Sequence, residues 1–150
     1  MKYWEDVEPG IDRFGNTVID RDDVIEFAER FDPQPFHLSD EAAAQTHFGR
    51  MCASGWHTAS LSMRMMVDFD QLSEFAFLGS PGLSELRWPH PVYPGDVLTC
   101  EREMLSKRRS ASRPGMGLVE SELRTLNQDG TVVMVMRSSV FVKVRDPQAV

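Results

Sequence analysis

Apolar side chains recur every three or four positions between residues 21 and 31, where they form a single stripe. The stripe consists of Val24, Phe27, Ala28 and Phe31. This period is that of a helix with one buried face, so the pattern predicts an amphipathic helix over 21–31. Asp20 stands directly before the segment and is expected to cap it, because a short acidic side chain accepts hydrogen bonds from the first free N–H groups.

A second helical segment, at about 53–69, is apolar on almost every side. Its large apolar residues are Trp56, Leu61, Met63, Met65, Met66, Val67 and Phe69. A helix with so little polar surface is expected inside the protein. His57 and Arg64 are the exceptions, and in a buried helix they need partners, for which a subunit interface is one source.

From residue 74 onward the pattern changes to alternation, which is typical of strands. Strands are predicted at 75–78, 83–88, 96–106, 118–126 and 131–144. Asn127 to Gly130 is typical of a hairpin turn between the last two. In the last strand one shared apolar face is predicted, made of Val132, Met134, Met136, Val140, Val142 and Val144.

The beginning of the chain carries a weaker pattern. Residues 1–16 are predicted to be an irregular lead-in with two glycine turns, followed by a short strand at 17–19. Ser39 is expected to cap a second, short helix through 42–44. His47 follows that helix and is expected to lie exposed in a loop.

The 150 residues are predicted to form one domain, 1–150, of class α+β, because a long apolar helix precedes an antiparallel run of strands. No run approaches the roughly 18 apolar residues of a membrane span. The net charge of −7 disfavours a nucleic-acid partner. Cys52 and Cys100 form no metal motif, so both are expected to be small buried side chains. Without a basic-then-apolar leader, a cytoplasmic location is expected.

Candidate chemistry lies in the segment 31–37, which carries an acid and an imidazole, Asp32 and His37, on a turn stiffened by Pro33 and Pro35. A carboxylate and an imidazole held close together can share proton transfer on one water. In the simpler alternative, Asp32 only ends a helix and His37 only caps the next. Phe31 and Phe36 flank the pair and are expected to raise the pKa of Asp32 by excluding water.

Several motifs of the chain resemble those of the MaoC-like dehydratases, which include the (R)-specific enoyl-CoA hydratases with their Asp-x-x-x-x-His motif. The similar segments, in order, are Asp32 to Asp40, Ala42-Ala43, Phe48-Gly49, Ala53 to Gly55, Pro91 to Asp96 and Asn127 to Gly130. The resemblance covers most of the chain. It implies a hotdog fold, in which an antiparallel sheet wraps around the central helix.

The resemblance also implies an activity, the reversible addition of water to a 2-enoyl-coenzyme A thioester, as in fatty acid metabolism. Asp32 and His37 would hold one water, and which of them is acid or base stays open, because the pair titrates as a unit. The N–H of Gly55 would bind the thioester carbonyl at the start of the central helix, where the helix dipole favours negative charge. Ser54 beside it is expected to help bind substrate. For Gly55, close packing of the helix is the alternative explanation.

Two positions depart from the hydratase motif. Gln34 stands where hydratases have Asn, and Met63 stands where they have a serine on the central helix. Ser62 points about 100° away from that position. Ser60 lies on a similar face and is the candidate to replace the missing hydroxyl at the substrate.

A short basic run, Lys107 to Arg109, is the one basic cluster of the sequence. Arg108 and Arg109 would hold the phosphates of coenzyme A through charge-assisted hydrogen bonds. Such a run is also typical of a solvated strand end.

Two other functions remain open at this stage. One is an acyl-CoA thioesterase with Asp32 facing the thioester carbon, because the same fold supports different reactions. The other is an acyl-CoA-binding subunit whose Met63 marks lost activity. No metal or separate cofactor is expected, and a homodimer is predicted, because a single sheet of this kind leaves an edge to be covered.

Overall fold

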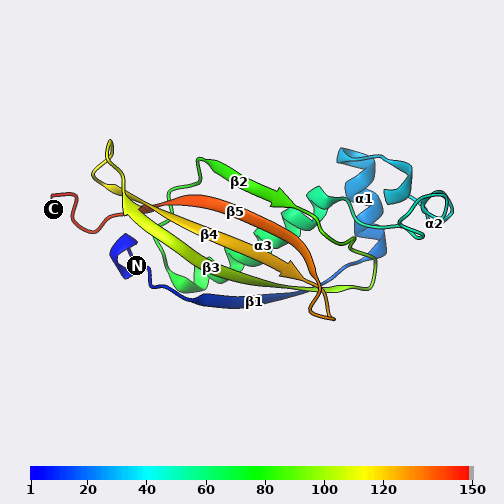
Figure 1. Ribbon diagram of the computed structural model, residues 1–150, viewed down its shortest axis with the longest axis horizontal. Coiled ribbons are helices and arrows are strands. Elements are labelled where there is room, and N and C mark those ends of the chain that lie inside the picture. The colour runs from blue at the N-terminus through cyan, green and yellow to red at the C-terminus, as the bar shows by residue number, and fades with distance from the viewer. Residues whose placement is uncertain (149–150) are drawn as a thin grey trace.

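The computed structural model describes residues 1–148. It contains a five-stranded antiparallel sheet, in the order β1-β3-β4-β5-β2, curved around one long helix, α3. Figure 1 shows the sheet in front of α3, with α1 and α2 at one end of the molecule and both termini at the other. The predicted α+β class and hotdog arrangement are therefore confirmed.

The α-helices are α1 (Arg21–Phe31), α2 (Asp40–Ala43) and α3 (Gly55–Ser73). The chain also forms two single-turn 3-10 helices, η1 (Trp4–Asp6) near the N-terminus and η2 (Pro35–His37) between α1 and α2. The strands are β1 (Ile11–Val18), β2 (Gly82–Arg87), β3 (Val97–Arg109), β4 (Met116–Leu126) and β5 (Val132–Lys143). Among the described residues, no helix is both long enough and apolar enough to cross a membrane.

The helix boundaries follow the capping residues of the sequence. Helix α1 has the predicted bounds, and its N-cap Asp20 accepts a hydrogen bond from the Asp23 N–H at 3.1 Å. Ser39 caps α2 in the same way, through the Ala42 N–H at 3.2 Å. His47 is exposed in the following loop, as expected.

Helix α3 is buried on one face only, so the prediction that it lies wholly inside the protein is corrected. Thr58, Ser62 and Met65 are buried. Trp56, Met63 and Val67 stay 58%, 44% and 41% exposed and follow one another along the other side. Arg64 lies on the surface, where its partner is Asp68, one turn further along the same helix, at 3.0 Å. It therefore needs no buried partner.

Strand β1 replaces the second part of the predicted irregular lead-in, from Ile11, and its last two residues lie in the strand predicted at 17–19. It pairs with β3, with a register shift between Phe14 and Thr17. The strand lies at an edge of the sheet and is largely exposed, and Phe14 is its one large side chain that packs against the core. With so little apolar alternation, the sequence pattern missed residues 11–16.

Two strand predictions are also corrected. Residues 75–78 form only isolated bridges, from Phe75 to Lys2 and from Phe77 to Val142. In β5, Leu126 pairs with Val132 but Thr125 pairs with Met134, so Val133 forms a bulge. A bulge reverses the side on which later residues point, and Val132 therefore does not share the face of Met134.

The core lies between the concave face of the sheet and α3. Its buried side chains include Leu98, Cys100, Leu123, Met134 and Met136. Ser62 carries a polar link between the helix and the sheet, a 2.7 Å hydrogen bond between its hydroxyl and that of Thr125. Cys52 and Cys100 are free and buried, as predicted. The burial raises the pKa of the Cys52 thiol to about 11.

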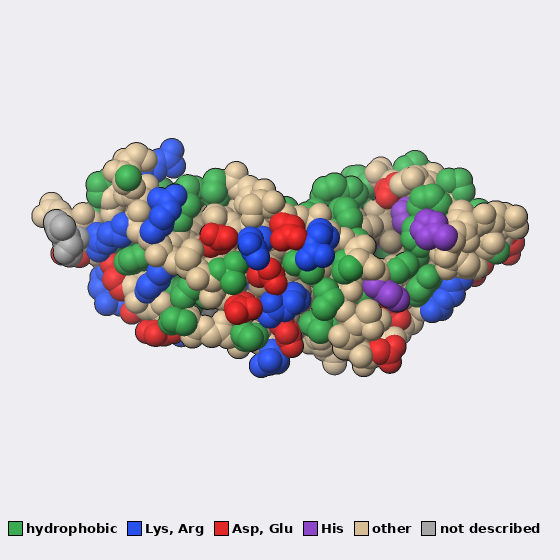
Figure 2. All heavy atoms as spheres, viewed as in Figure 1, with side chains coloured by type: hydrophobic (Ala, Val, Ile, Leu, Met, Phe, Trp, Pro, Cys, Tyr) green, Lys and Arg blue, Asp and Glu red, His purple; other side chains and the backbone are tan. Residues whose placement is uncertain are grey.

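The convex face of the sheet carries an ion-pair network. Arg124 contacts Glu122 at 2.9 Å and Glu103 at 3.1 Å, and Arg137 contacts Glu122 at 2.9 Å. Figure 2 shows acidic and basic side chains interleaved in the middle of this face. Because opposite charges alternate there, this side of the sheet presents no single-sign surface to a charged partner.

His57 joins α1 to α3. Its ring stacks on Phe27 with a 4.7 Å centroid distance and a 7° angle between the planes. The side chain is buried, and its Nδ1 atom has no hydrogen-bond partner among the described residues. Burial lowers the pKa of His57, and the nearby Asp23 carboxylate only partly opposes this shift. The fold therefore favours the neutral imidazole.

We expect His57 to weaken the fold on the acid side of neutrality. Above its ordinary pKa of about 6.5, the imidazole is neutral in the folded and unfolded states alike. As the pH falls below about 6.5, the unfolded chain binds a proton that the folded protein resists, so stability is lost. His57→Phe keeps the ring stack and should lose less stability between about pH 7.5 and about pH 5.5, as measured by urea unfolding.

The control for this prediction is His47→Phe, because His47 is exposed. It should retain the pH dependence of the unaltered protein. The same loss of stability in all three proteins would contradict the role assigned to His57.

Candidate active site

Asp32 ends α1, and the turn that follows brings His37 back beside it. The Asp32 N–H still bonds to the Ala28 carbonyl at 2.9 Å, so the helix fixes its backbone. Pro33 and Pro35 shape the turn into η2, which ends on His37. Asp32 Oδ2 lies 3.4 Å from His37 Nε2. The structure thus brings together the acid and imidazole that the sequence singled out.

The orientation of His37 is set by a backbone carbonyl. Its Nδ1 lies 2.7 Å from the Cys52 oxygen. A carbonyl only accepts, so Nδ1 carries a hydrogen and Nε2 faces Asp32. The His37 side chain is 7% exposed. Its ring packs edge-to-face with the Phe36 ring, with 4.6 Å between the ring centroids. The imidazole is therefore held in one tautomer and one orientation, with Nε2 directed at the carboxylate.

The pKa of Asp32 is lowered, which corrects the prediction that it is raised. Burial raises this pKa, as expected, but hydrogen bonds from Ser54 and Gln34, together with the nearby His37, outweigh it. Ser54 Oγ and Gln34 Nε2 each lie 2.7 Å from a carboxylate oxygen. The sequence argument relied on apolar cover, but the Phe31 side chain is 65% exposed.

Ser54 connects the Asp32–His37 pair to the start of α3. Its hydroxyl donates to Asp32 and accepts from the Trp56 N–H at 3.3 Å, which makes Ser54 the N-cap of the helix. The residue is 1% exposed. The sequence suggested a substrate contact for Ser54 and missed the bond to Asp32. A serine before a helical glycine is a capping signal, but its second partner lies far away in sequence.

Gly55 presents a free backbone N–H at the first position of α3. No hydrogen-bond acceptor for this N–H is found in residues 1–148, whereas the next N–H groups bond to Ser54. A Cβ at Gly55 would lie 2.5 Å from the Trp88 ring, so the glycine is also required for packing. The packing explanation is therefore supported, and the binding of a thioester carbonyl by the Gly55 N–H stays a prediction. The free N–H at a helix N-terminus suits an oxygen that gains negative charge.

Ser60 and Ser62 of α3 lie near the position of Met63 along the helix, but both use their hydroxyls elsewhere. Ser60 is exposed, and its hydroxyl bonds to the Trp56 carbonyl of its own helix at 2.8 Å. Ser62 faces the sheet, bonded to Thr58 and Thr125. Neither hydroxyl contacts Asp32 or His37. The hydroxyl that does bind the acid is that of Ser54.

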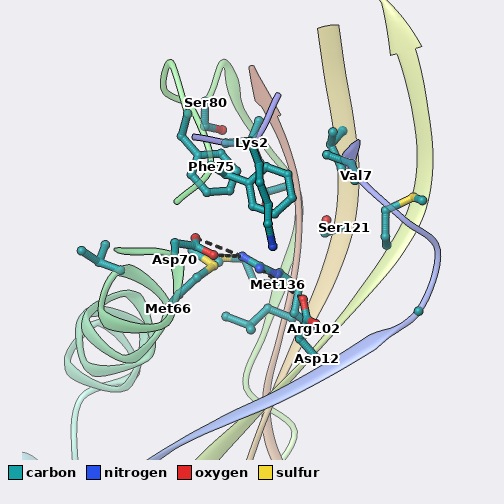
Figure 3. A pocket seen from close by; sticks show the side chains of 18 of the residues that line it. Lys2, Val7, Asp12, Met66, Asp70, Phe75, Ser80, Arg102, Ser121 and Met136 are labelled. Carbon is teal, nitrogen blue, oxygen red and sulfur yellow. Dashed lines mark hydrogen bonds and ion pairs between the residues drawn. The ribbon is translucent and has the colours of Figure 1, made fainter. Parts of the chain in front are cut away.

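A cavity of about 870 Å³ opens beside the second half of α3. It lies between Met63, Met66 and Asp70 of the helix, the concave face of the sheet and the N-terminal segment (Figure 3). Its walls are mostly apolar. The exposed stripe of α3, formed by Trp56, Ser60, Met63 and Val67, runs from Gly55 toward this cavity. Met63 lies roughly 12 Å along the helix axis from Gly55.

The basic run Lys107 to Arg109 lies at the opposite end of the sheet from Asp32 and His37 (Figure 1). Lys107 donates to three backbone carbonyls of the N-terminal segment, at 2.8–3.2 Å. Arg109 pairs with Glu5 at 3.2 Å. Arg108 is exposed and, alternating with its neighbours, points to the other face of the sheet. Within one chain the structure does not bring these residues to the Asp32–His37 pair.

Comparisons of the sequence and of the structure with known proteins point to the same family. The model of the MaoC like domain matches residues 9–123. A MaoC-like dehydratase from Rhodospirillum rubrum is 37% identical and superposes with a TM-score of 0.87, over 97% of this chain and 99% of that one. A 3-hydroxybutyryl-CoA dehydratase of Methylorubrum extorquens is 32% identical, over 73% of this chain and 69% of the relative. The uncharacterized protein YdeM of Bacillus subtilis is 30% identical, over 83% and 86%.

Ser54→Ala should raise the pKa of Asp32, because it removes a hydrogen bond that favours the ionised carboxylate. The pKa is measured by following the Asp32 carboxyl carbon in an NMR titration. The same change also costs about 1 kcal/mol of stability through the lost helix cap.

The matched control is Ser39→Ala. It removes the N-cap of α2 without touching Asp32. This variant should lose comparable stability and leave the pKa of Asp32 in place. An unchanged Asp32 titration in Ser54→Ala would show that this hydroxyl does not control the carboxylate.

Proposed function

The chain belongs to the MaoC-like dehydratase family, and we propose that it catalyses the reversible addition of water to a 2-enoyl thioester of coenzyme A. The observation that carries this proposal is the 3.4 Å approach of Asp32 Oδ2 to His37 Nε2. Both groups face one point from a stiff turn, where a single water can contact each of them. The similarity to a protein named 3-hydroxybutyryl-CoA dehydratase supports the same class of reaction.

In the hydration direction, the water oxygen bonds to carbon 3 of the enoyl group and the water loses one proton. Carbon 2 gains one proton, so one group of the site accepts and another donates. The lowered pKa of Asp32 favours its carboxylate as the acceptor. His37 is then the donor in its imidazolium form, in which Nε2 carries the proton that moves to carbon 2 while Nδ1 keeps its hydrogen bond to the Cys52 carbonyl. Dehydration runs through the same two groups in reverse.

The N–H of Gly55 supplies the electrostatic part of the mechanism. As the water oxygen bonds to carbon 3, the electrons of the double bond between carbons 2 and 3 shift toward the thioester carbonyl, and its oxygen gains the negative charge of an enolate. A free N–H at the start of α3 stabilises that charge, and the helix dipole acts in the same direction.

The cavity beside α3 serves as the site of the acyl group in this proposal. The exposed stripe of Trp56, Ser60, Met63 and Val67 leads from the Gly55 N–H to its mouth. An acyl chain laid along the stripe replaces exposed apolar surface by buried contact. Met63 then forms part of the wall of the acyl path. A hydroxyl at this position is not needed to hold Asp32.

The phosphates of coenzyme A require basic side chains, and Arg108 is a better candidate to bind them than Arg109. Arg109 is already neutralised by Glu5. Arg108 is exposed and has no acidic partner in the described part of the chain. In one protomer it lies far from Gly55, so it would act on a substrate held by the other protomer of a dimer.

A homodimer is proposed on the basis of the half-covered helix. Trp56, Met63 and Val67 leave a continuous apolar stripe on one side of α3. The edge strands β1 and β2 carry unpaired backbone groups that another chain can cover. A second copy placed on this side would shield the stripe and close the acyl path from water.

We expect Asp32 and His37 to act as one unit on the water. Asp32→Asn and His37→Ala should each lower the rate of enoyl hydration by about two to four orders of magnitude. The double variant should be little worse than the slower single one, because effects within a unit are not additive. The measurement is the loss of enoyl absorbance with a panel of enoyl-coenzyme A thioesters.

Controls for this experiment are His47→Ala and Asp68→Asn, which alter exposed residues outside the site. Both should retain normal rates. Near-normal turnover in both Asp32→Asn and His37→Ala would show that the pair is structural. Release of free thiol without hydration would instead identify a thioesterase, and binding without either reaction would identify an acyl-binding subunit.

Size determination at micromolar concentration should give about twice the chain mass of 17.0 kDa. Val67→Glu places a charge on the exposed stripe and should shift the protein toward the monomer, with loss of activity. Glu29→Lys, on the exposed side of α1, should leave the size unchanged. A stable monomer with full activity would rule out the dimeric site.

A further inference from the structure

One wall of the cavity beside α3 is ionic, although most of its lining is apolar. Arg102 of β3 lies between two carboxylates, at 2.8 Å from Asp70 of α3 and 3.3 Å from Asp12 of β1. The Arg102 and Asp70 side chains remain 15% and 16% exposed. Figure 3 shows this ion cluster facing the cavity, with the Lys2 amine directed toward it from the opposite side. Charged groups therefore meet whatever occupies this part of the cavity.

The floor of the cavity carries two further polar groups. Ser121 of β4 and Ser138 of β5 are direct cross-strand partners, so their side chains stand next to each other on the concave face. Neither hydroxyl makes a hydrogen bond to another described residue. Their neighbours along the strands, including Val119, Leu123, Met136 and Val140, are apolar. A pair of unsatisfied hydroxyls on such a floor is an adjacent donor and acceptor site.

The charges around the cavity disfavour a carboxylate on the ligand. Four acidic side chains line it, Asp6, Glu8, Asp12 and Asp70, against two basic ones, Lys2 and Arg102. Arg102 is already paired with Asp12 and Asp70, so an added carboxylate meets an excess of negative charge. A plain alkyl chain would displace water from the ion cluster and the two serines. It cannot replace the hydrogen bonds that the water makes there, so its binding at this place is unfavourable.

We propose that this cavity takes an acyl group that carries an uncharged hydroxyl group beyond its reacting carbons. A hydroxyl both donates and accepts, so it can donate to a carboxylate of the ion cluster and accept from Ser121 or Ser138. The apolar walls hold the carbon chain between the thioester and this hydroxyl. The assignment rests on the proposed function only in taking the cavity as the acyl site.

The test is equilibrium binding, which needs no chemical step. Calorimetry compares saturated acyl-coenzyme A thioesters of matched length whose chains end in a methyl, a hydroxyl or a carboxylate, over a series of lengths. At the length that reaches the ion cluster, the hydroxyl form should bind at least about tenfold more tightly than the methyl form, and the carboxylate form more weakly than the hydroxyl form. Equal binding of the methyl and hydroxyl forms at every length would overturn the proposal.

Variants locate the preference within the cavity. Replacing Ser121 and Ser138 together by alanine should reduce the preference for the hydroxyl form, and Asp70→Asn should do the same while keeping the size of the side chain. Ser106→Ala, an exposed position of β3 outside the cavity, should keep the preference. A preference that persists unchanged in both cavity variants would place the hydroxyl elsewhere and overturn the assignment.

The two proposals fail in different ways. Preferred binding of the hydroxyl form together with no hydration of any enoyl thioester would remove the proposed reaction and leave this assignment. Efficient hydration with no preference between methyl and hydroxyl chains, at any length, would remove this assignment and leave the reaction.

Discussion

The candidate site depends on the hydrogen bonds of one buried hydroxyl. Ser54 caps α3 and at the same time holds Asp32 at the end of α1 by a bond of 2.7 Å. Within residues 1–148, no other side-chain hydrogen bond joins these two helices. This hydroxyl therefore fixes the position of the acid relative to the free N–H of Gly55. It also sets the charge of the site, because its bond favours the ionised carboxylate. The same atom thus joins local helix capping to the placement and electrostatics of the site.

The two sides of helix α3 have different surroundings and different side chains. Toward the sheet it uses small polar residues, Thr58 and Ser62, and the Ser62 hydroxyl bonds to the Thr58 carbonyl within the helix and to the Thr125 hydroxyl of the sheet. Toward the open side it presents large apolar residues that an isolated chain leaves exposed. A helix that appears apolar all round in sequence therefore has one face in the core and one open face, which the proposed acyl path and the proposed dimer would cover. Hydrophobic periodicity cannot separate these uses, because it counts apolar residues without saying what covers them.

Much of the fold could be predicted because local signals agree with it. The apolar stripe and Asp20 gave the bounds of α1, and Asn127 to Gly130 gave the last hairpin. The Asp32–His37 pair could be found because two prolines and a family motif mark one short segment. The remaining features depend on distant contacts. The ionisation of Asp32 depends on Ser54, 22 residues away, and the side on which Val132 points depends on a bulge that sequence alternation does not show. The first part of strand β1, residues 11–16, escaped prediction because a largely exposed edge strand shows little apolar alternation.

The N-terminal segment has a consequence for how the family can vary. The Trp4 ring lies where a Cβ of Gly117 would stand, 2.2 Å from the nearest ring atom, and Lys107 fastens the same segment by three backbone carbonyls. That segment also closes one side of the cavity. A relative that gains a side chain at position 117 cannot keep the indole in this place. Positions 4 and 117 should therefore change together in evolution, and lineages that lose the pair are free to acquire a wider cavity and other substrates.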